Sequence, residues 1–429
     1  MRRSGSPSPV TDFPSGVGEE ARAKPPCQAP VLRQAQHEGL QAHAPRPTDL
    51  ARAAARPKPQ GETKPHHPNG PHPEPVEGRG PGTTKKRAFS ETATANACKG
   101  AGNPPGITVI GAGVAGLCTA VTLAERGAAV TLHERSESLG GAAASWLAGG
   151  MLPPFCEAES ADASIVAPGL AAIDWWESRV PGVMRNGTLV VASSRDAGEI
   201  ARFGRRTSGA QPLDAEGIEA LEPDLAGRFR QGLHFAAEAH LDPRRALTAL
   251  AERFERLGGT IRFGSDVTPE AVGGDVVIDC RGIAANAPSL RSVRGEMLIL
   301  RSDEIRLSRP VRLLHPRMPV YVVPRAGGLF MVGATMIESE ASGGPTLRAA
   351  VELMNAAYAL HPAFAEAEVI DMKAGRRPAF PDNLPRVTRG GRIVSVNGLF
   401  RHGFLLAPDC AEKAAERVFG PRTREEIAA

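Results

Sequence analysis

The sequence predicts an α/β fold with an α+β part, in which a domain built on a parallel sheet carries an inserted antiparallel sheet. Three observations support this class. A strand–helix–strand pattern begins at Ile107, and a strand–turn–helix pattern closes the folded part near Gly420. Between them, β-branched runs, two of them joined by a short glycine-containing turn, indicate strands and a hairpin of an antiparallel sheet.

Residues 1–105 differ in composition from the rest of the chain. They hold 18 of the 38 prolines and two aromatic residues, Phe13 and Phe89. No apolar period of 2 or 3.6 runs through them, so they bury too little apolar surface to offset the entropy of ordering. We therefore predict a disordered, Pro-rich extension, followed by roughly 320 residues, which suit two domains of ordinary size.

Charge, hydropathy and cysteine use exclude several classes of function. The net charge is +4 and the basic residues form no single stripe, so we expect no nucleic-acid partner. No run of 18 apolar residues and no export signal are present, so we expect no contact with a membrane. The six cysteines form no Cys-x-x-Cys pair and no zinc-ligand spacing. We expect a cytoplasmic protein without a metal.

The first folded segment has the order strand, glycine turn, helix and strand. Ile107–Ile110 is a β-branched run typical of a buried parallel strand. A turn with the pattern Gly-x-Gly-x-x-Gly follows at once, then a helix that ends at Gly127 and a strand that ends at Glu134. This is a complete βαβ opening of a Rossmann-like domain.

Each glycine of this turn has a physical reason. Gly111 permits the tight turn, Gly113 lets the backbone approach a pyrophosphate, and Gly116 lets the helix pack against the strand. The free N–H groups of the helix start favour phosphates. Glu134 lies 23 residues after Gly111, where a carboxylate accepts the ribose hydroxyls. A glycine-rich turn without a ligand is the alternative, and the flanking strand, helix and acid argue against it; they do not say which dinucleotide binds.

Two later segments favour FAD over NAD. Residues 134–159 form a loop rich in Gly, Ala and Ser, which lets backbone approach a flat ring system. A nicotinamide enzyme usually continues here with a further βαβ unit. Residues 394–420 add a strand, a glycine-bracketed turn and a helix whose N-terminus suits the electron-rich end of a cofactor. Residues 274–282 read as a buried strand ending in Gly282.

Between these segments the pattern predicts further elements in order. They are a strand at 187–193, a helix within 213–226, an amphipathic helix within 242–259, a strand at 293–302 and a hairpin over 319–336. With Ala326-Gly327 as a two-residue turn, Tyr321 pairs with Val332 and shares a face with Ala334 and Met336. From the hairpin alone, Tyr321 is better interpreted as core packing than as a positioned hydroxyl.

The chain from Ile107 to Gly420 resembles the D-amino-acid-oxidase-like FAD enzymes, and among them the glycine oxidases of thiamine biosynthesis. The resemblance rests on the motifs VIGAGVAGL, ASWLAGGMLPP, HLDPRRALTAL, VRGEM, YVVPRAGGLFMVGATM, GRRPAFPDNLP and FRHGFLLAPD. It implies an FAD-binding domain over 106–184, 228–290 and 375–420, and a substrate domain over 185–227 and 291–374. Leu399, where a histidine is common, and Arg281, where a small residue is common, depart from the family pattern.

The resemblance also implies the residues around the cofactor and the substrate. The cofactor set, including residues from the turn argument, is Gly111, Gly113, Gly116, Glu134, Arg135, Ser145, Gly150, Met151, Val267, Gly282, Gly403, Phe404 and Leu405. Arg377 matches the carboxylate-binding arginine, which a forked guanidinium suits. Tyr321 matches its partner hydroxyl, Met336 an apolar pocket residue, and Arg401 a residue on the pyrimidine side of the flavin. From the residues alone, Arg377 is equally compatible with a surface turn, and Arg376 is interpreted as a neighbour only.

The resemblance implies oxidative deamination of glycine or a similar small amino acid by oxygen, with non-covalently bound FAD. The expected products are the keto acid, ammonia and hydrogen peroxide, with a role in thiamine thiazole synthesis. One alternative is a D-amino-acid or sarcosine-type dehydrogenase of the same fold with another electron acceptor. A second alternative is a dinucleotide-binding protein without catalysis. We expect a homo-oligomer, as is frequent in the family.

Overall fold

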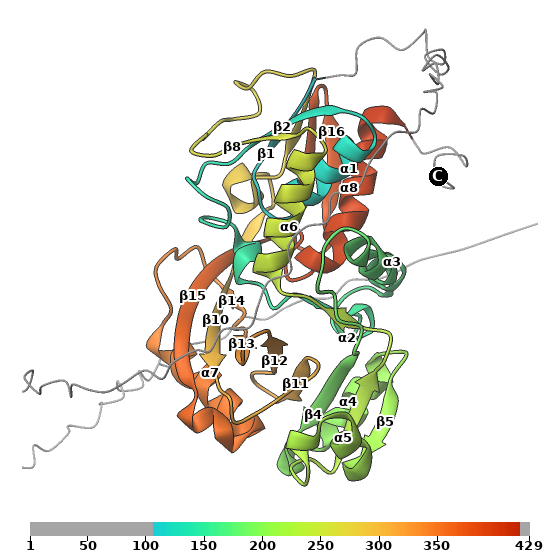
Figure 1. The fold of residues 1–429 in the computed structure, drawn as a ribbon, viewed down its shortest axis with the longest axis vertical. Coiled ribbons are helices and arrows are strands. Elements are labelled where there is room, and N and C mark those ends of the chain that lie inside the picture. The colour runs from blue at the N-terminus through green and yellow to red at the C-terminus, as the bar shows by residue number, and fades with distance from the viewer. Residues whose placement is uncertain (1–105, 421–429) are drawn as a thin grey trace, which may run out of the picture. The chain divides into compact units, whose positions relative to one another are not determined.

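The computed structural model describes residues 106–420. The predicted extension, residues 1–105, lies outside the described residues, as do residues 421–429. Within the described part the chain forms two large sheets, a two-stranded ribbon and eight α-helices (Figure 1). The predicted class, a Rossmann-like domain with an inserted, mostly antiparallel sheet, is confirmed.

The first sheet has six strands in the order β16–β17–β9–β1–β2–β8. Its strands are β1 (Gly106–Ile110), β2 (Ala129–His133), β8 (Thr260–Arg262), β9 (Val276–Asp279), β16 (Arg386–Gly390) and β17 (Ile393–Asn397). All neighbours run parallel except β16, an edge strand that pairs antiparallel with β17. Because β1 runs parallel to its neighbours β2 and β9, the carboxyl ends of these three strands meet at one edge.

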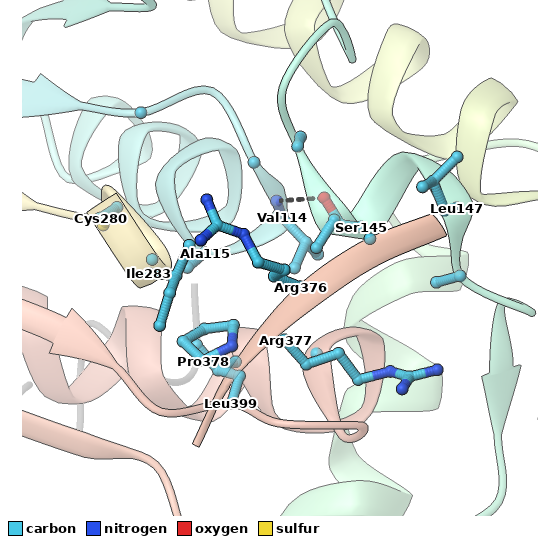
Figure 2. A pocket seen from close by; sticks show the side chains of 18 of the residues that line it. Val114, Ala115, Ser145, Leu147, Cys280, Ile283, Arg376, Arg377, Pro378 and Leu399 are labelled. Atoms are coloured by element: carbon cyan, nitrogen blue, oxygen red, sulfur yellow. Dashed lines mark hydrogen bonds between the residues drawn. The ribbon is translucent and has the colours of Figure 1, made fainter. Parts of the chain in front are cut away.

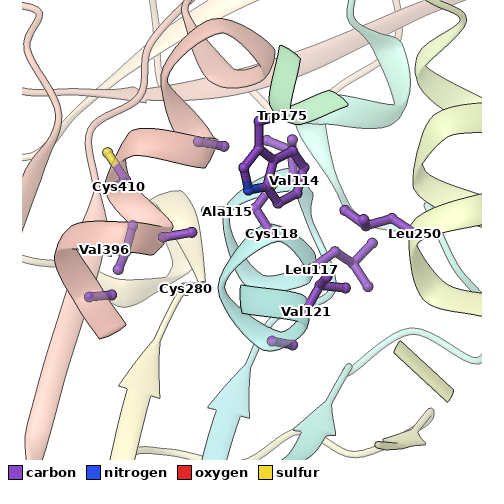
Figure 3. Close-up of a cluster of buried hydrophobic side chains, with 14 of the residues drawn as sticks. Val114, Ala115, Leu117, Cys118, Val121, Trp175, Leu250, Cys280, Val396 and Cys410 are labelled. Atoms are coloured by element: carbon purple, nitrogen blue, oxygen red, sulfur yellow. The ribbon is translucent and has the colours of Figure 1, made fainter. Parts of the chain in front are cut away.

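Four helices share a hydrophobic core with this sheet (Figure 3). They are α1 (Val114–Glu125), α3 (Val166–Glu177), α6 (Pro243–Arg256) and α8 (Gly403–Phe419). In α1 every residue from Val114 to Leu123 is buried, as expected for a helix that is apolar on all sides. Helix α6 begins where the sequence predicts, because the Asp242 carboxylate accepts the N–H of Arg244 at 2.9 Å and Pro243 opens the first turn.

The second sheet has nine strands, eight of them in the order β14–β10–β13–β12–β11–β4–β6–β5, with β15 paired to β10. Its strands are β4 (Thr188–Ala192), β5 (Gln211–Asp214), β6 (Gln231–Phe235), β10 (Arg291–Arg301), β11 (Val311–Leu314), β12 (Val320–Arg325), β13 (Leu329–Gly333), β14 (Ile337–Glu338) and β15 (Glu368–Ala379). All pairs are antiparallel except β4 with β11. The long β10–β15 pair brings both strands to the first domain at the 375–379 end.

Four further α-helices and a two-stranded ribbon complete these elements. They are α2 (Pro154–Glu157), α4 (Gly198–Arg206), α5 (Ala215–Leu221), α7 (Leu347–Leu360) and a ribbon of β3 (Met151–Leu152) with β7 (Ala239–His240). Helices α4 and α5 lie beside β4 and β5, and α7 lies beside the strands around β10 (Figure 1). Between residues 106 and 420, no helix combines the length and the apolar character that a membrane span requires.

The strands cross the predicted domain limits in two places. β6 falls within 228–290, the range expected in the FAD-binding domain, yet it pairs with β4 and β5 in the second sheet. β15 is continuous across residue 375, where the sequence suggests a limit between the domains. The other limits stay a prediction.

The predicted register of the hairpin is wrong by one residue. Arg325 pairs with Leu329 and Tyr321 with Gly333, so the loop has three residues. Two consecutive glycines, Gly327 and Gly328, both adopt positive φ of 76° and 66°, which a three-residue loop accommodates. As a result, Tyr321 shares its face with Gly333 and not with Val332.

Candidate active site

One large cavity lies between the two sheets. Its volume is about 410 Å³. The walls come from the carboxyl ends of β1, β2, β9 and β17 on one side and from β10, β12 and β15 on the other. In parallel sheets this edge is the place where ligands bind.

The glycine turn after β1 has the geometry of a dinucleotide cradle. Gly111 has φ +100°, and a Cβ there would lie 2.7 Å from the Cys280 carbonyl oxygen. A Cβ on Gly116 would lie only 1.8 Å from the Gly111 carbonyl oxygen, so α1 starts as close to β1 as the sequence predicts. Gly113 lines the cavity and caps α1, whose first turn holds no acidic residue. The N–H groups there suit an anion.

Glu134 lies at the end of β2, buried and already oriented by the backbone. Its Oε2 accepts the N–H of Ala112 at 2.8 Å, and its Oε1 accepts the N–H of Ser136 at 3.0 Å. Both Glu134 and the exposed Arg135 line the cavity. A fixed carboxylate beside the glycine turn is the arrangement that accepts ribose hydroxyls.

The small-residue loop after β2 continues this wall. The Ser145 hydroxyl accepts the N–H of Val114 at 3.1 Å and so ties the loop to the start of α1 (Figure 2). Gly150 has φ +79°, and a Cβ there would lie 2.1 Å from the Leu241 carbonyl oxygen. Met151, the next residue, also lines the cavity.

The turn between β17 and α8 forms a further part of the cavity wall. Gly282, Gly403, Phe404 and Leu405 all line the cavity. The Asn397 side chain donates to the Gly282 carbonyl oxygen at 2.9 Å, and the N–H of Phe400 donates to the Pro378 carbonyl oxygen at 2.9 Å. Phe400 has φ +50°, a strained value for an aromatic residue that this double attachment maintains.

The second sheet contributes Tyr321 and Arg377, both half-buried in the cavity wall. The Tyr321 ring packs between Gly149 and Gly333, since a Cβ on either glycine would lie 2.8 Å from a ring carbon. Arg377 donates from Nη1 to the Thr335 carbonyl oxygen at 3.1 Å. Burial lowers the pKa of Arg377, which still leaves a guanidinium protonated at neutral pH.

Three predicted site residues do not line the cavity. Gly116 lies behind the turn, in the packing role expected of it. Val267 is half-buried, although its neighbours Ser265 and Asp266 reach the wall. Met336 is 58 % exposed and follows the three-residue hairpin loop that shifts the register. The cofactor role of Val267 and the substrate role of Met336 stay predictions.

Comparison with known proteins decides the family. The profile of the FAD dependent oxidoreductase (DAO) family matches residues 106–417. The chain belongs to this family. FAD is therefore its cofactor, and the glycine cradle, the fixed Glu134 carboxylate and the small-residue loop are the features that fit it.

Three relatives show how close the similarity is. The chain is 56 % identical over 323 residues to a putative thiamine biosynthesis oxidoreductase ThiO of Rhizobium etli, covering 75 % of this chain and 98 % of the relative. It is 28 % identical to a glycine oxidase of Pseudomonas aeruginosa, covering 73 % and 94 % of the two chains. A crystal structure of glycine oxidase from Geobacillus kaustophilus has a TM-score of 0.65 at 21 % identity, over 75 % and 96 % of the chains. The fold is thus shared over the whole described part.

Gly116→Ala tests the cradle of this FAD-dependent oxidoreductase. The added methyl would displace the Gly111 carbonyl and with it the turn that faces the diphosphate, so we expect at least about 100-fold weaker FAD binding. Flavin absorbance per polypeptide after gel filtration measures it. Gly390→Ala is the control, because nothing lies within 4 Å of its Cβ position. A Gly116→Ala protein with full flavin content would contradict the role.

Sequence reasoning missed Glu157, a buried carboxylate in the cavity wall. Its Oε1 lies 2.8 Å from Nη2 of Arg312 and 2.9 Å from Nη2 of Arg401, while its Oε2 lies 2.7 Å from Nε of Arg401. The ring of His402 adds a contact of 3.2 Å to Oε2. Burial opposes its ionisation, but the Arg401 and Arg312 guanidiniums hold the pKa of Glu157 well below its usual range. Arg401, predicted beside the flavin, is therefore oriented by this carboxylate.

Two further arginines line the cavity. Arg281, which departs from the family pattern, is held by both oxygens of Asp279 at 2.9 Å. Arg376 leaves β15 in a different direction from Arg377, as alternation along a strand requires (Figure 2). Arg376 is therefore more than the sequence neighbour expected, since it belongs to the wall itself.

The pKa of a second buried carboxylate, that of Glu238, is shifted in the opposite direction to the pKa of Glu157. The Oε1 of Glu238 accepts the N–H groups of Phe155 and Cys156 at 3.0 and 2.7 Å. Burial raises the pKa of Glu238 to about 7, against the effect of these hydrogen bonds and of the nearby Arg312. Arg312 therefore has one fully ionised partner, Glu157, and one that titrates near neutral pH.

Proposed function

We propose that this chain catalyses the FAD-dependent oxidative deamination of glycine or of a similarly small amino acid. The products are the keto acid, glyoxylate in the case of glycine, with ammonia and hydrogen peroxide. One observation supports this most directly: Arg377 and Tyr321 line the same cavity as the dinucleotide cradle. A cation beside the cofactor suits a substrate with a carboxylate.

Arg377 binds the carboxylate in this proposal. Its bond to the Thr335 carbonyl uses one of the five N–H donors of a guanidinium, which leaves a forked pair for the substrate. The Tyr321 ring packs with Met297 and Met331 in a small apolar cluster, and this packing keeps the hydroxyl in one place.

The chain itself needs to supply no strong acid or base. Bound FAD supplies the acceptor for the hydride that leaves the substrate Cα. The contribution of the protein is orientation of the amino acid and exclusion of bulk water. For glycine the balance is one O₂ and one water consumed, with one glyoxylate, one ammonia and one hydrogen peroxide formed. The similarity to the putative thiamine biosynthesis oxidoreductase of Rhizobium etli supports a role in thiamine biosynthesis, as a supplier of the thiazole precursor.

We also propose that FAD is bound without a covalent link. Cys280 lines the cavity but is buried, and burial raises its pKa, so little thiolate is available to react. Cys410 is likewise buried among the side chains of the core. Acid or heat denaturation is expected to release all the flavin into the supernatant. Flavin that stays with the precipitated protein would contradict this.

The deciding experiment is anaerobic titration of the yellow protein with glycine, sarcosine and D-alanine. Bleaching of the flavin absorbance by one of them identifies the substrate, and a silent spectrum with all three would overturn the proposal. Readmitting air should restore the colour and yield one hydrogen peroxide per substrate. Rapid reduction of an artificial dye with slow peroxide formation would instead indicate a dehydrogenase.

A further inference from the structure

Gly295 of β10 lies directly beneath the Arg377 guanidinium. A Cβ at Gly295 would lie 2.1 Å from Nη1 and 2.2 Å from both Cζ and Nη2 of Arg377. Nearly equal distances to Nη1, Cζ and Nη2 place this position out of the guanidinium plane, beside the edge that joins the two Nη atoms. The end of the Arg377 side chain therefore fills the space that a side chain at residue 295 would occupy.

The same guanidinium is held at its edge by Thr335. Thr335 is itself fixed by Glu296: its N–H donates to the Glu296 carbonyl oxygen at 3.2 Å, and its hydroxyl donates to Oε2 of Glu296 at 3.1 Å. Glu296 is buried and paired with Arg294 at 2.9 Å. The surface under Arg377 is therefore rigid, and only the missing side chain of Gly295 leaves room for the cation.

We infer that Gly295 is a positioning residue for substrate recognition, which sets the height of the Arg377 guanidinium above β10. The inference rests on the proposed function, because it takes Arg377 as the carboxylate-binding group. An ordinary contact needs at least 3.4 Å, so a methyl group moves the guanidinium by more than 1 Å. Displacement of a binding group by about 1 Å lowers reaction efficiency by roughly 100-fold.

The fold tolerates this change. The atoms that a Cβ would meet belong to the end of a flexible side chain and not to backbone. No positive φ is required at Gly295, and alanine suits a strand interior at least as well as glycine does. The cofactor cradle lies on the first sheet, so FAD binding is expected to persist.

The experiment compares Gly295→Ala with the matched strand glycine change Gly390→Ala in the holoenzyme. Flavin content, the dissociation constant of acetate from the flavin spectrum, and KM and kcat for glycine are measured. The Gly295→Ala protein should keep its flavin. Its dissociation constant for acetate and its KM for glycine should each rise by about 30- to 100-fold. Gly390→Ala should match the unchanged protein, since its Cβ position meets nothing within 4 Å.

A second variant separates this inference from the proposed function. Arg377→Lys should weaken acetate binding in the unchanged background and add little to Gly295→Ala, because both remove the same contact. Additive losses would overturn the inference, as would normal acetate binding or lost flavin in Gly295→Ala. If Arg377→Lys and Arg377→Ala both bind acetate normally, the proposed role of Arg377 fails instead.

Discussion

Replacing Arg377 with alanine is expected to raise the KM for glycine by about two to three orders of magnitude, while the protein keeps its FAD. Truncating one partner of a buried, hydrogen-bonded charge pair typically costs about 2–5 kcal/mol, and each 1.4 kcal/mol is about tenfold. Arg377 extends from the second sheet, whereas the cradle belongs to the first. Steady-state kinetics and the flavin spectrum of the same preparation measure both effects.

Lys373→Ala is the matched control for loss of one positive charge from the same strand. Lys373 is exposed and pairs with Asp371 at 3.4 Å. Its removal should change the glycine KM less than twofold, since exposed pairs contribute little. Glycine amide lacks the carboxylate, so its turnover should hardly distinguish Arg377→Ala from the unchanged protein. Equal losses with glycine and glycine amide would contradict carboxylate recognition.

The dinucleotide cradle could be predicted from the sequence because its parts are close together along the chain. Gly111, the start of α1 and Glu134 lie within one βαβ unit, where turn chemistry and strand order follow from local residues. The strand at 274–282 and the late helix were predictable for the same reason: each has its own boundary signals. Their common edge then follows from the parallel order of the strands.

The residues that the second sheet contributes to the cavity depend on the register of its strands, which the local sequence determines poorly. Gly327 and Gly328 allow two- and three-residue loops alike, and one residue of slip exchanges the faces of a strand. Tyr321 lines the cavity as predicted, because its position in β12 does not depend on the register of the partner strand. Met336 comes after the loop that shifts the register, and its side chain is exposed. Arg376 also lines the cavity, although the alternation of side chains along β15 would place it on the face opposite Arg377.

The role of Glu157 was not predicted, because the arginines that pair with it are distant in sequence. Arg312 lies 155 residues away and Arg401 lies 244 residues away, and neither is marked by a motif that points to an acid. The one signal is the position of Glu157, an acid directly after the apolar run 151–156 that enters the cavity. Buried acids need a charged partner, so such a residue predicts a cation without identifying it.

Glu157→Gln is expected to destabilise the protein by about 3–5 kcal/mol at neutral pH, because it leaves the guanidiniums of the buried Arg312 and the half-buried Arg401 without this counter-charge. The pKa of Glu157 is depressed in the folded state, so its contribution is full above the ordinary value of 4.5 and is lost as pH falls. Urea unfolding with saturating FAD, at pH 8 and below pH 4.5, measures the free energy of unfolding. An unchanged free energy at pH 8 would show that the two arginines need no carboxylate.

Glu238→Gln is the matched change beside the same Arg312, and its effect has the opposite sign. The folded-state pKa of Glu238 is raised to about 7, so the carboxyl favours the folded state below about pH 4.5 and opposes it increasingly as pH rises towards 7. Glutamine keeps an oxygen for the N–H groups of Phe155 and Cys156 and removes the charge. The variant should match the parent at pH 4.5 and exceed its stability at pH 8 by on the order of 3 kcal/mol. A gain of stability in Glu238→Gln beside a loss in Glu157→Gln at pH 8 would demonstrate that Arg312 is neutralised by Glu157 alone, whereas a loss in both variants would mean that both carboxylates share it.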